Sequence, residues 1–207
     1  MFETMKPMEI ETRSFEIITE ILGDRVLEPE NELVIKRVIH TTADFDYADN
    51  LAFSDGAVAK GVEALRSGCH IVTDTSMAMS GINKTTLAKL GGQVHCFIAD
   101  PDVAREAQKR GVTRSTVSME YAARLEQPCI FAIGNAPTAL IALHELMKVG
   151  KVKPALIIGV PVGFVNVVES KELIMGDNVP YIVARGRKGG SNVAAAICNA
   201  MLYQIMR

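Results

Sequence analysis

Three cations and three glycines are concentrated in the segment Arg185 to Ser191, which reads RGRKGGS. Arginine can bind a carboxylate through two parallel hydrogen bonds, and glycine lets the backbone approach a ligand closely. The segment lies between a predicted strand and a predicted helix, so the helix dipole also favours an anion there. We interpret it as an anion-binding loop, and the alternative is a solvated basic turn.

A second candidate is GNAPTAL, Gly134 to Leu140, which follows another predicted strand. Gly134 allows a tight turn, Asn135 can cap the following helix, and Pro137 suits the first helical turn. An exposed helix start binds anions through its free backbone N–H groups. A strand-to-helix turn with no further role is an equally good interpretation.

A third candidate is PVGFVNVVESK, Pro161 to Lys171. Gly163 permits close approach of the backbone, and Lys171 supplies a cation in a loop or at a helix start. The alternative is an ordinary loop.

His40 ends the run KRVIH, and helical spacing places it on one face with Arg37. A neighbouring cation disfavours a second positive charge, so without an intervening carboxylate the ring is expected to stay neutral near pH 7. A neutral imidazole at that pH is ready to exchange a proton. A structural histidine at a helix end is the alternative.

The other residues that could do chemistry favour structural interpretations. His70 and His95 sit in strand-like runs and are expected to be hydrogen-bonded core or strand-end residues, while His144 is expected to be a partly exposed helical residue. The run from Asp100 to Asp102 is typical of a turn and helix cap. We assign no metal site. No GxSxG, GxxxxGK[ST] or GxGxxG motif is present, which disfavours a serine nucleophile and a nucleotide.

These segments must be positioned by strands that alternate with helices. Predicted strands are Cys69 to Thr73, Gln93 to Ile98, Cys129 to Ile133, Ala155 to Gly159, Tyr181 to Ala184 and, more weakly, Asn50 to Phe53. Predicted helices are Asp55 to Ser67, Asp102 to Arg110, Ser115 to Leu125, Thr138 to Val149 and Val193 to Met206. This alternation predicts a three-layer α/β/α fold with a mainly parallel sheet. Two further helices, Ser14 to Leu22 and Glu30 to Thr41, form an N-terminal extension.

Composition sets the remaining limits. The 207 residues, 48% of them hydrophobic, predict one domain over residues 1–207 with a sizeable core. A net charge of -2 provides no global positive field for nucleic acid. Four scattered cysteines without a CxxC pair are typical of reduced thiols in a cytoplasm. Glutamates interrupt the apolar runs near the N-terminus, so neither a signal peptide nor a membrane span is expected.

Six motifs together, in this order, resemble the precorrin-8X methylmutase family of cobalamin biosynthesis. They are RSFEII at Arg13 to Ile18, KRVIH at Lys36 to His40, TRS at Thr113 to Ser115, GNAPTAL, PVGFV with ESK, and GRKGGS. The match runs nearly end to end. The segment Asp74 to Met77 departs from the family pattern near Ser76.

The resemblance implies a flavodoxin-like fold and a homodimer with active sites near the subunit interface. It also implies a corrinoid tetrapyrrole substrate whose methyl group moves from C-11 to C-12. By the family's pattern His40 delivers a proton to the macrocycle. The residues expected to bind the substrate are Ser14, Arg37, Arg114, Ser115, Asn135, Gly163, Lys171, Arg187, Gly189, Gly190 and Ser191. A sigmatropic shift needs neither nucleophile nor redox cofactor, so no cofactor and no protein-bound metal are expected.

Two other classes remain as alternatives. A non-catalytic tetrapyrrole carrier would use the same cations, although it would have no use for a proton donor at His40. An oxidoreductase of doubly wound fold is the second, and the missing dinucleotide motif counts against it.

Overall fold

Six short strands form one sheet in the computed structural model, which describes residues 7–206. The strands are β1 (Leu51–Phe53), β2 (His70–Thr73), β3 (Val94–His95), β4 (Cys129–Ile133), β5 (Leu156–Gly159) and β6 (Tyr181–Ala184). They lie in the order β1-β6-β5-β4-β2-β3, in which all neighbours are parallel except β1 and β6. Without β1, the strands numbered along the chain lie in the order 2-1-3-4-5, which is the flavodoxin-like arrangement.

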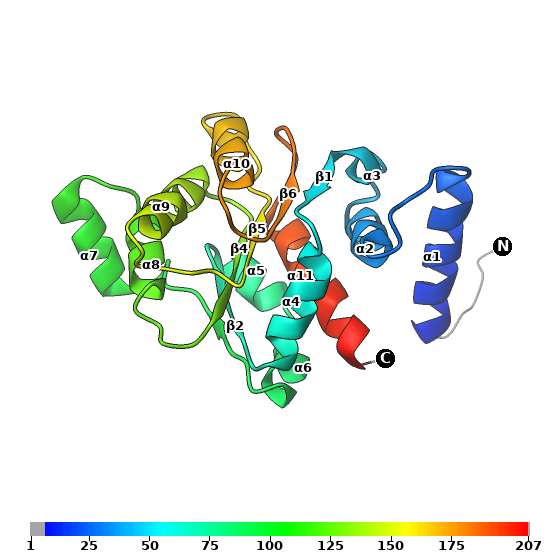
Figure 1. Cartoon of the computed structure of the whole chain (residues 1–207), viewed down its shortest axis with the longest axis horizontal. Coiled ribbons are helices and arrows are strands. Elements are labelled where there is room, and N and C mark those ends of the chain that lie inside the picture. The colour runs from blue at the N-terminus through cyan, green and yellow to red at the C-terminus, as the bar shows by residue number, and fades with distance from the viewer. Residues whose placement is uncertain (1–6, 207) are drawn as a thin grey trace.

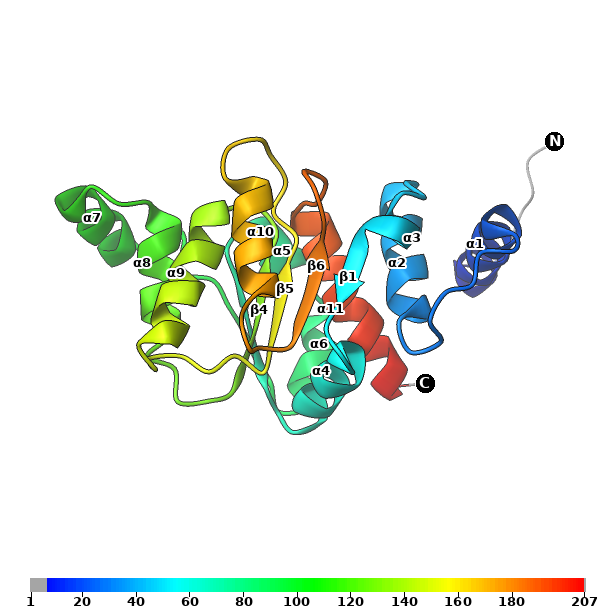
Figure 2. The same cartoon turned by 45° about the horizontal axis from the view of Figure 1, so that its top comes forward.

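Helices cover both faces of this sheet. They are α1 (Pro7–Leu22), α2 (Glu32–Thr42), α3 (Tyr47–Asn50), α4 (Ala57–Arg66), α5 (Ser76–Gly81), α6 (Lys84–Lys89), α7 (Pro101–Arg110), α8 (Arg114–Ala122), α9 (Pro137–Lys148), α10 (Val167–Met175) and α11 (Ser191–Met206). One face is packed by α2, α4 and α11, and the other by α8, α9 and α10 (Figure 1). Helices α1 and α7 lie at opposite ends of the long axis (Figure 2).

The strand sequences explain the two-sided burial. In β4, Ile130 and Ala132 point into the core beneath α4 and α11, whereas Phe131 and Ile133 point into the core beneath α8 and α9. Alternate residues of a strand face opposite sides of a sheet, so a strand covered on both faces must be apolar throughout. All five residues of β4 are buried, as this argument requires.

The predicted fold class is confirmed, with differences in particular elements. The weak run at Asn50 to Phe53 is β1, an antiparallel edge strand, and the expected strand from Gln93 to Ile98 is reduced to two residues in β3. Helix α1 spans Pro7–Leu22, so it already includes residues ahead of the expected start at Ser14. The sequence interpretation missed α5 and α6, which have six residues each, because so short a helix shows no clear periodicity. It also interpreted the start of α10 as a loop.

Candidate active site

The glycine-rich loop, residues 185–190, connects β6 to α11 at the carboxyl edge of the parallel strands. A lysine beneath it holds its shape: Lys171 Nζ donates to the carbonyls of Gly186 and Lys188, each at 2.8 Å. Lys171 lies in the second turn of α10 and is only 1% exposed. The expectation that Lys171 is a loop or helix-start cation is therefore corrected.

Two further backbone bonds tie this loop to the end of β5. Gly163 N–H donates to the carbonyl of Arg187 at 3.2 Å, and Gly190 N–H donates to that of Val160 at 2.9 Å. At Gly189 the contact is so close that a Cβ atom would lie 2.1 Å from the Val160 carbonyl oxygen. Only glycine fits at that position. The predicted residues Gly163, Gly189 and Gly190 therefore gather at one place in the fold.

Ser191 begins α11 and hydrogen-bonds to Thr75 across the β2 end, with their hydroxyl oxygens 2.8 Å apart. Thr75 is itself the N-cap of α5, where its side chain accepts the N–H of Ala78. The hydroxyl of Ser191 therefore holds two helix starts together, and its predicted contact with substrate stays a prediction.

Lys188 connects the glycine-rich loop to the end of α2. Its ammonium group lies 2.6 Å from a carboxylate oxygen of Asp44 and 2.6 Å from one of Asp46. Hydrogen bonding to Lys188 lowers the pKa of Asp44, and the same carboxylates raise the pKa of Lys188. Arg187 is exposed and has no ion-pair partner within residues 7–206. Of the three cations of the loop, Lys188 is therefore neutralised, whereas Arg187 is available to an anion.

His40 is exposed in the last turn of α2 and faces α1. Its ring centroid lies 5.7 Å from that of Phe15, and the Arg37 guanidinium lies 4.9 Å from the same Phe15 ring. The prediction that Arg37 and His40 share a face is thus confirmed. Arg37 is itself paired with a carboxylate, because its guanidinium donates to Glu11 at 2.7 Å. Ser14 is adjacent on α1, and its hydroxyl donates to the carbonyl of Ile10 at 2.7 Å.

A residue that the sequence interpretation left unassigned, Asp74, organises the turn after β4. Its carboxylate accepts the backbone N–H groups of Gly134, Asn135 and Ala136 at 2.9, 2.8 and 2.7 Å. Asp74 is 1% exposed, and burial raises its pKa while the three N–H bonds oppose the shift. The backbone donors that could have bound an external anion are therefore already occupied.

The prediction that Asn135 caps α9 is wrong. The N-cap is Ala136, without a side-chain hydrogen bond, because Asp74 supplies the capping acceptor from another strand. The Asn135 side chain is exposed. A signal that could have revealed Asp74 is its position directly after β2, since β2 and β4 flank the point where the strand order reverses.

The last two predicted residues begin α8. Arg114 is exposed, whereas Ser115 is buried. Their N-cap, Thr113, donates to the Thr138 hydroxyl of α9 at 2.9 Å, which places the starts of α8 and α9 together. The structure thus brings together six predicted residues near the ends of β5 and β6, namely Gly163, Lys171, Arg187, Gly189, Gly190 and Ser191. Ser14, Arg37 and His40 form a second group on α1 and α2, and Arg114 and Ser115 a third on α8.

The remaining candidates have the structural roles that the sequence indicates. His70 and His95 are hydrogen-bonded to each other at 2.8 Å, and His144 is half-buried with its Nδ1 2.9 Å from Asp177. Asp100 caps α7. All four cysteines are free, and burial raises the pKa of three thiols, to about 12 for Cys69 and Cys198 and to about 11 for Cys129. These three thiols are poor nucleophiles at neutral pH.

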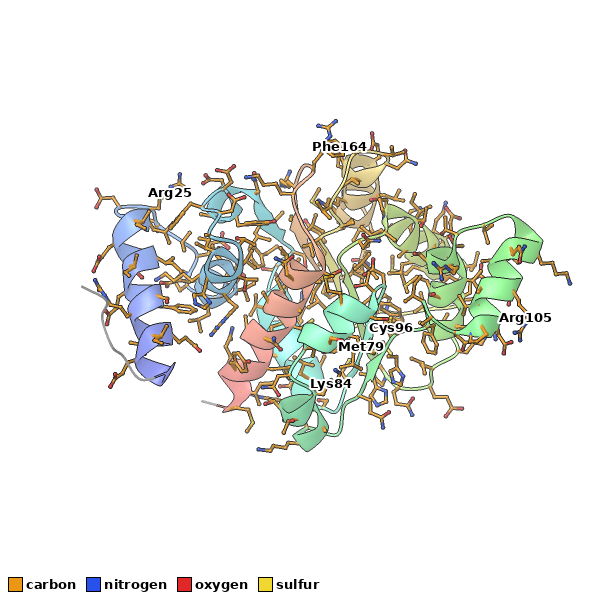
Figure 3. All side chains as sticks on the ribbon, turned by 180° about the vertical axis from the view of Figure 1, so that it is seen from behind. Arg25, Met79, Lys84, Cys96, Arg105 and Phe164 are labelled. Carbon is orange, nitrogen blue, oxygen red and sulfur yellow. The ribbon has the colours of Figure 1, made fainter. Side chains whose placement is uncertain are left out.

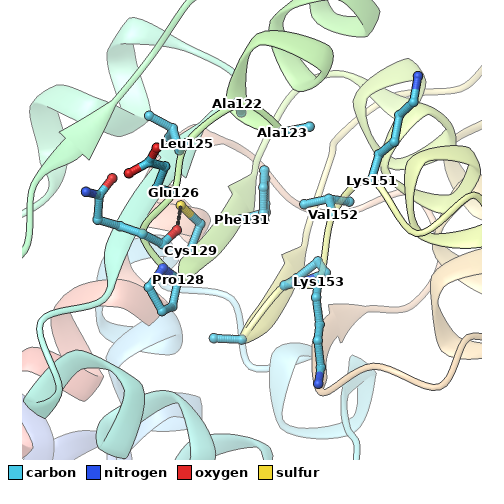
Figure 4. A pocket seen from close by; sticks show the side chains of 13 residues that line it. Ala122, Ala123, Leu125, Glu126, Pro128, Cys129, Phe131, Lys151, Val152 and Lys153 are labelled. Atoms are coloured by element: carbon cyan, nitrogen blue, oxygen red, sulfur yellow. Dashed lines mark hydrogen bonds between the residues drawn. The ribbon is translucent and has the colours of Figure 1, made fainter.

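A cavity of about 460 Å³ lies at the other edge of the sheet, where the chain enters β4 and β5 (Figure 4). Its lining includes Glu126, Cys129, Lys151 and Lys153. The ammonium ends of Lys151 and Lys153 point away from each other, so this cavity offers no converging cations (Figure 4). Ligands of doubly wound folds bind beyond the carboxyl ends of the strands, which also favours the opposite edge.

Fold and site together define a doubly wound α/β protein with a cationic, glycine-rich site at the carboxyl edge of its sheet. The family model for precorrin-8X methylmutase matches residues 9–204. Cobalt-precorrin-8 methylmutase of Salmonella typhimurium is 49% identical over 99% of each chain, and that of Priestia megaterium is 45% identical over 96% of this chain and 88% of the relative. The solved structure of the Thermus thermophilus precorrin-8X methylmutase superposes with a TM-score of 0.87 at 38% identity, covering 95% of this chain and 97% of the other. This chain belongs to the precorrin-8X methylmutase family.

The family makes the chain an isomerase of cobalamin biosynthesis, which disfavours the carrier alternative. Within residues 7–206, no helix is both long enough and apolar enough to span a membrane.

Proposed function

We propose that this chain moves a methyl group from C-11 to C-12 of precorrin-8X or its cobalt form, giving hydrogenobyrinate or cobyrinate. The relatives named above carry names for both forms of this substrate. Any cobalt would lie in the macrocycle, as part of the substrate. We further propose that the chain works in the cytoplasm, for which four free thiols are suitable.

One observation favours such a substrate: an apolar tip lies directly beside the cationic loop. Phe164 and Val165 are 85% and 78% exposed, and their neighbour Gly163 is hydrogen-bonded to Arg187. Phe164 projects from the fold at the top of Figure 3. A corrinoid combines a flat apolar ring with peripheral carboxylates, so adjacent apolar and cationic groups complement both parts.

His40 is the proposed proton donor, at a ring nitrogen of the macrocycle. The ion pairs of Lys188 with Asp44 and Asp46 tie the loop after α2 to the glycine-rich loop, which supports a role for His40 next to the proposed carboxylate site. Protonation at a ring nitrogen favours the tautomer from which the methyl group migrates. No nucleophile or redox group takes part in that step.

The test is turnover of precorrin-8X by His40→Ala and His40→Asn proteins, followed by absorbance in buffer without nucleotide, metal or reductant. General acid catalysis contributes about 10²–10⁴-fold, so kcat should fall by that factor in both variants while product affinity changes little. The asparagine variant keeps a hydrogen-bond donor but cannot titrate. Near wild-type turnover by His40→Asn would exclude proton transfer by His40. If the wild-type protein required an added nucleotide, metal or reductant for turnover, the proposed cofactor-independent methyl shift would be wrong.

The single domain over residues 1–207 and the homodimer are also proposals. The described residues surround one sheet, which supports a single domain. On α1, Ile10, Ile17 and Ile21 are 52%, 40% and 60% exposed, an apolar face that a second copy could cover next to Ser14. Sedimentation equilibrium should give twice the mass of the 22.4 kDa chain. The mass of a single chain at micromolar concentration would contradict the dimer.

A further inference from the structure

The lysine beneath the glycine-rich loop has an unusual combination of burial and charge. Lys171 is 1% exposed, and burial lowers its pKa to about 8, with no carboxylate among residues 7–206 to offset the shift. Its two hydrogen-bond acceptors are neutral carbonyls of the loop, at 2.8 Å each. A buried ammonium group without a counter-ion costs folding free energy, so some other gain must accompany it.

The two carbonyls reveal what the lysine does to the loop. A trans peptide unit holds its C=O and its N–H on opposite sides, and no peptide bond of the described chain is cis. Because the carbonyls of Gly186 and Lys188 point toward Lys171, the N–H groups of Arg187 and Gly189 point away from it. Within residues 7–206, neither of these N–H groups has a main-chain acceptor.

We propose that Lys171 is a positioning residue for substrate binding: it holds the glycine-rich loop so that the N–H groups of Arg187 and Gly189, together with the Arg187 guanidinium, face a carboxylate of the substrate. Lys171 acts through the loop and does not itself contact the ligand. This inference rests on the proposed function, because it takes the ligand to be a polycarboxylate. What this inference adds is that the two cations have different roles: Lys171 holds the loop in place, and Arg187 binds the carboxylate of the substrate.

The decisive variant is Lys171→Met, which has a similar length but no donor and no charge. The substitution removes a buried charge, and it also removes the donor of the two carbonyls that face the buried lysine. These two effects on stability oppose each other, so the melting temperature should change little. Affinity for hydrogenobyrinate, titrated by absorbance, should fall about tenfold or more as the donors lose their orientation.

Two further variants make the comparison quantitative. Lys171→Gln keeps an uncharged NH2 donor group and should bind with intermediate affinity; it also serves if the methionine variant does not fold. Ser170→Ala is the control, because Ser170 is buried next to Lys171 but its hydroxyl donates to Val167 within α10 and not to the loop. Its affinity should equal that of wild type.

A ligand-free measurement separates this inference from the proposed function. Amide hydrogen exchange over residues 185–190 should accelerate in Lys171→Met and stay unchanged in Ser170→Ala. If wild type fails to bind hydrogenobyrinate, the proposed substrate is wrong, whatever the exchange data show. If wild type binds and Lys171→Met binds equally well, or loses affinity only in proportion to a lower melting temperature, the positioning role is overturned.

Discussion

Two strand-to-helix connections, one from β4 to α9 and one from β6 to α11, begin from similar sequence signals and end in opposite hydrogen-bonding arrangements. Each contains at least one glycine at the carboxyl edge, and both lead into a helix. In the first, Asp74 occupies the backbone donors of three successive residues. In the second, a lysine occupies the carbonyls, and within residues 7–206 the N–H groups of Arg187 and Gly189 have no main-chain acceptor. The charge that the rest of the fold places behind such a turn thus decides which of its backbone groups are occupied.

The two connections are also in direct contact. A Cβ atom at Gly134 would lie 2.7 Å from the Cα atom of Ser191 and 2.8 Å from the Gly190 carbonyl oxygen. The β4–α9 connection, which we call the closed turn because Asp74 occupies its backbone donors, therefore packs against the β6–α11 connection, the open loop, and supports it rigidly. Rigid support of a binding loop reduces the entropy that binding would otherwise cost.

The largest effect is expected at the closed turn, from Asp74→Asn. An asparagine has one acceptor oxygen for donors that now use two, so at least one buried N–H loses its partner. The free energy of unfolding should fall by about 2–3 kcal/mol, the range for charge-assisted hydrogen bonds. Denaturant titration measures it.

Asp100→Asn is the matched control, because Asp100 also accepts a backbone N–H, from Asp102 at 2.8 Å, but at a helix N-cap. Asparagine is as good an N-cap as aspartate, so little change in stability is expected there. Equal stability of Asp74→Asn and wild type would show that the first turn does not depend on its internal carboxylate, and the contrast between the two connections would fail.

A smaller effect, on affinity rather than stability, is expected at the open loop from Arg187→Ala. A forked contact between an arginine and a carboxylate contributes on the order of 1.5–3 kcal/mol when partly desolvated, so hydrogenobyrinate should bind about tenfold more weakly or worse. The melting temperature should not change, because Arg187 is exposed and has no ion-pair partner among the described residues. Isothermal titration measures the affinity.

Arg105→Ala is the control for the loss of one positive charge at a position outside the glycine-rich loop. Arg105 is an exposed arginine on α7, at the far end of the molecule from α1 (Figure 3). Its removal should leave the affinity unchanged. Unaltered binding by Arg187→Ala as well would make the glycine-rich segment an ordinary basic turn.

Much of the fold and part of the site follow from local sequence. Periodic apolar runs gave the alternation of strands and helices, because burial on both faces of a parallel sheet demands continuous apolar strands such as β4. Short helices such as α5 were not predicted from the sequence, because six residues contain too few turns to show a helical period. Arg187 and the glycines around it were recognisable because their chemistry is carried by the residue types themselves.

Sequence alone thus determined the fold class, the family resemblance and the segments that carry cations and glycines. Only the tertiary structure decided which donors are free. Asp74 and the turn that it closes are 60 residues apart, and Lys171 lies 15 and 17 residues from the carbonyls that it holds. Hydrogen bonds and burial depend on distance in space, and no local pattern records which charge a strand or helix from elsewhere in the chain will bring to a turn.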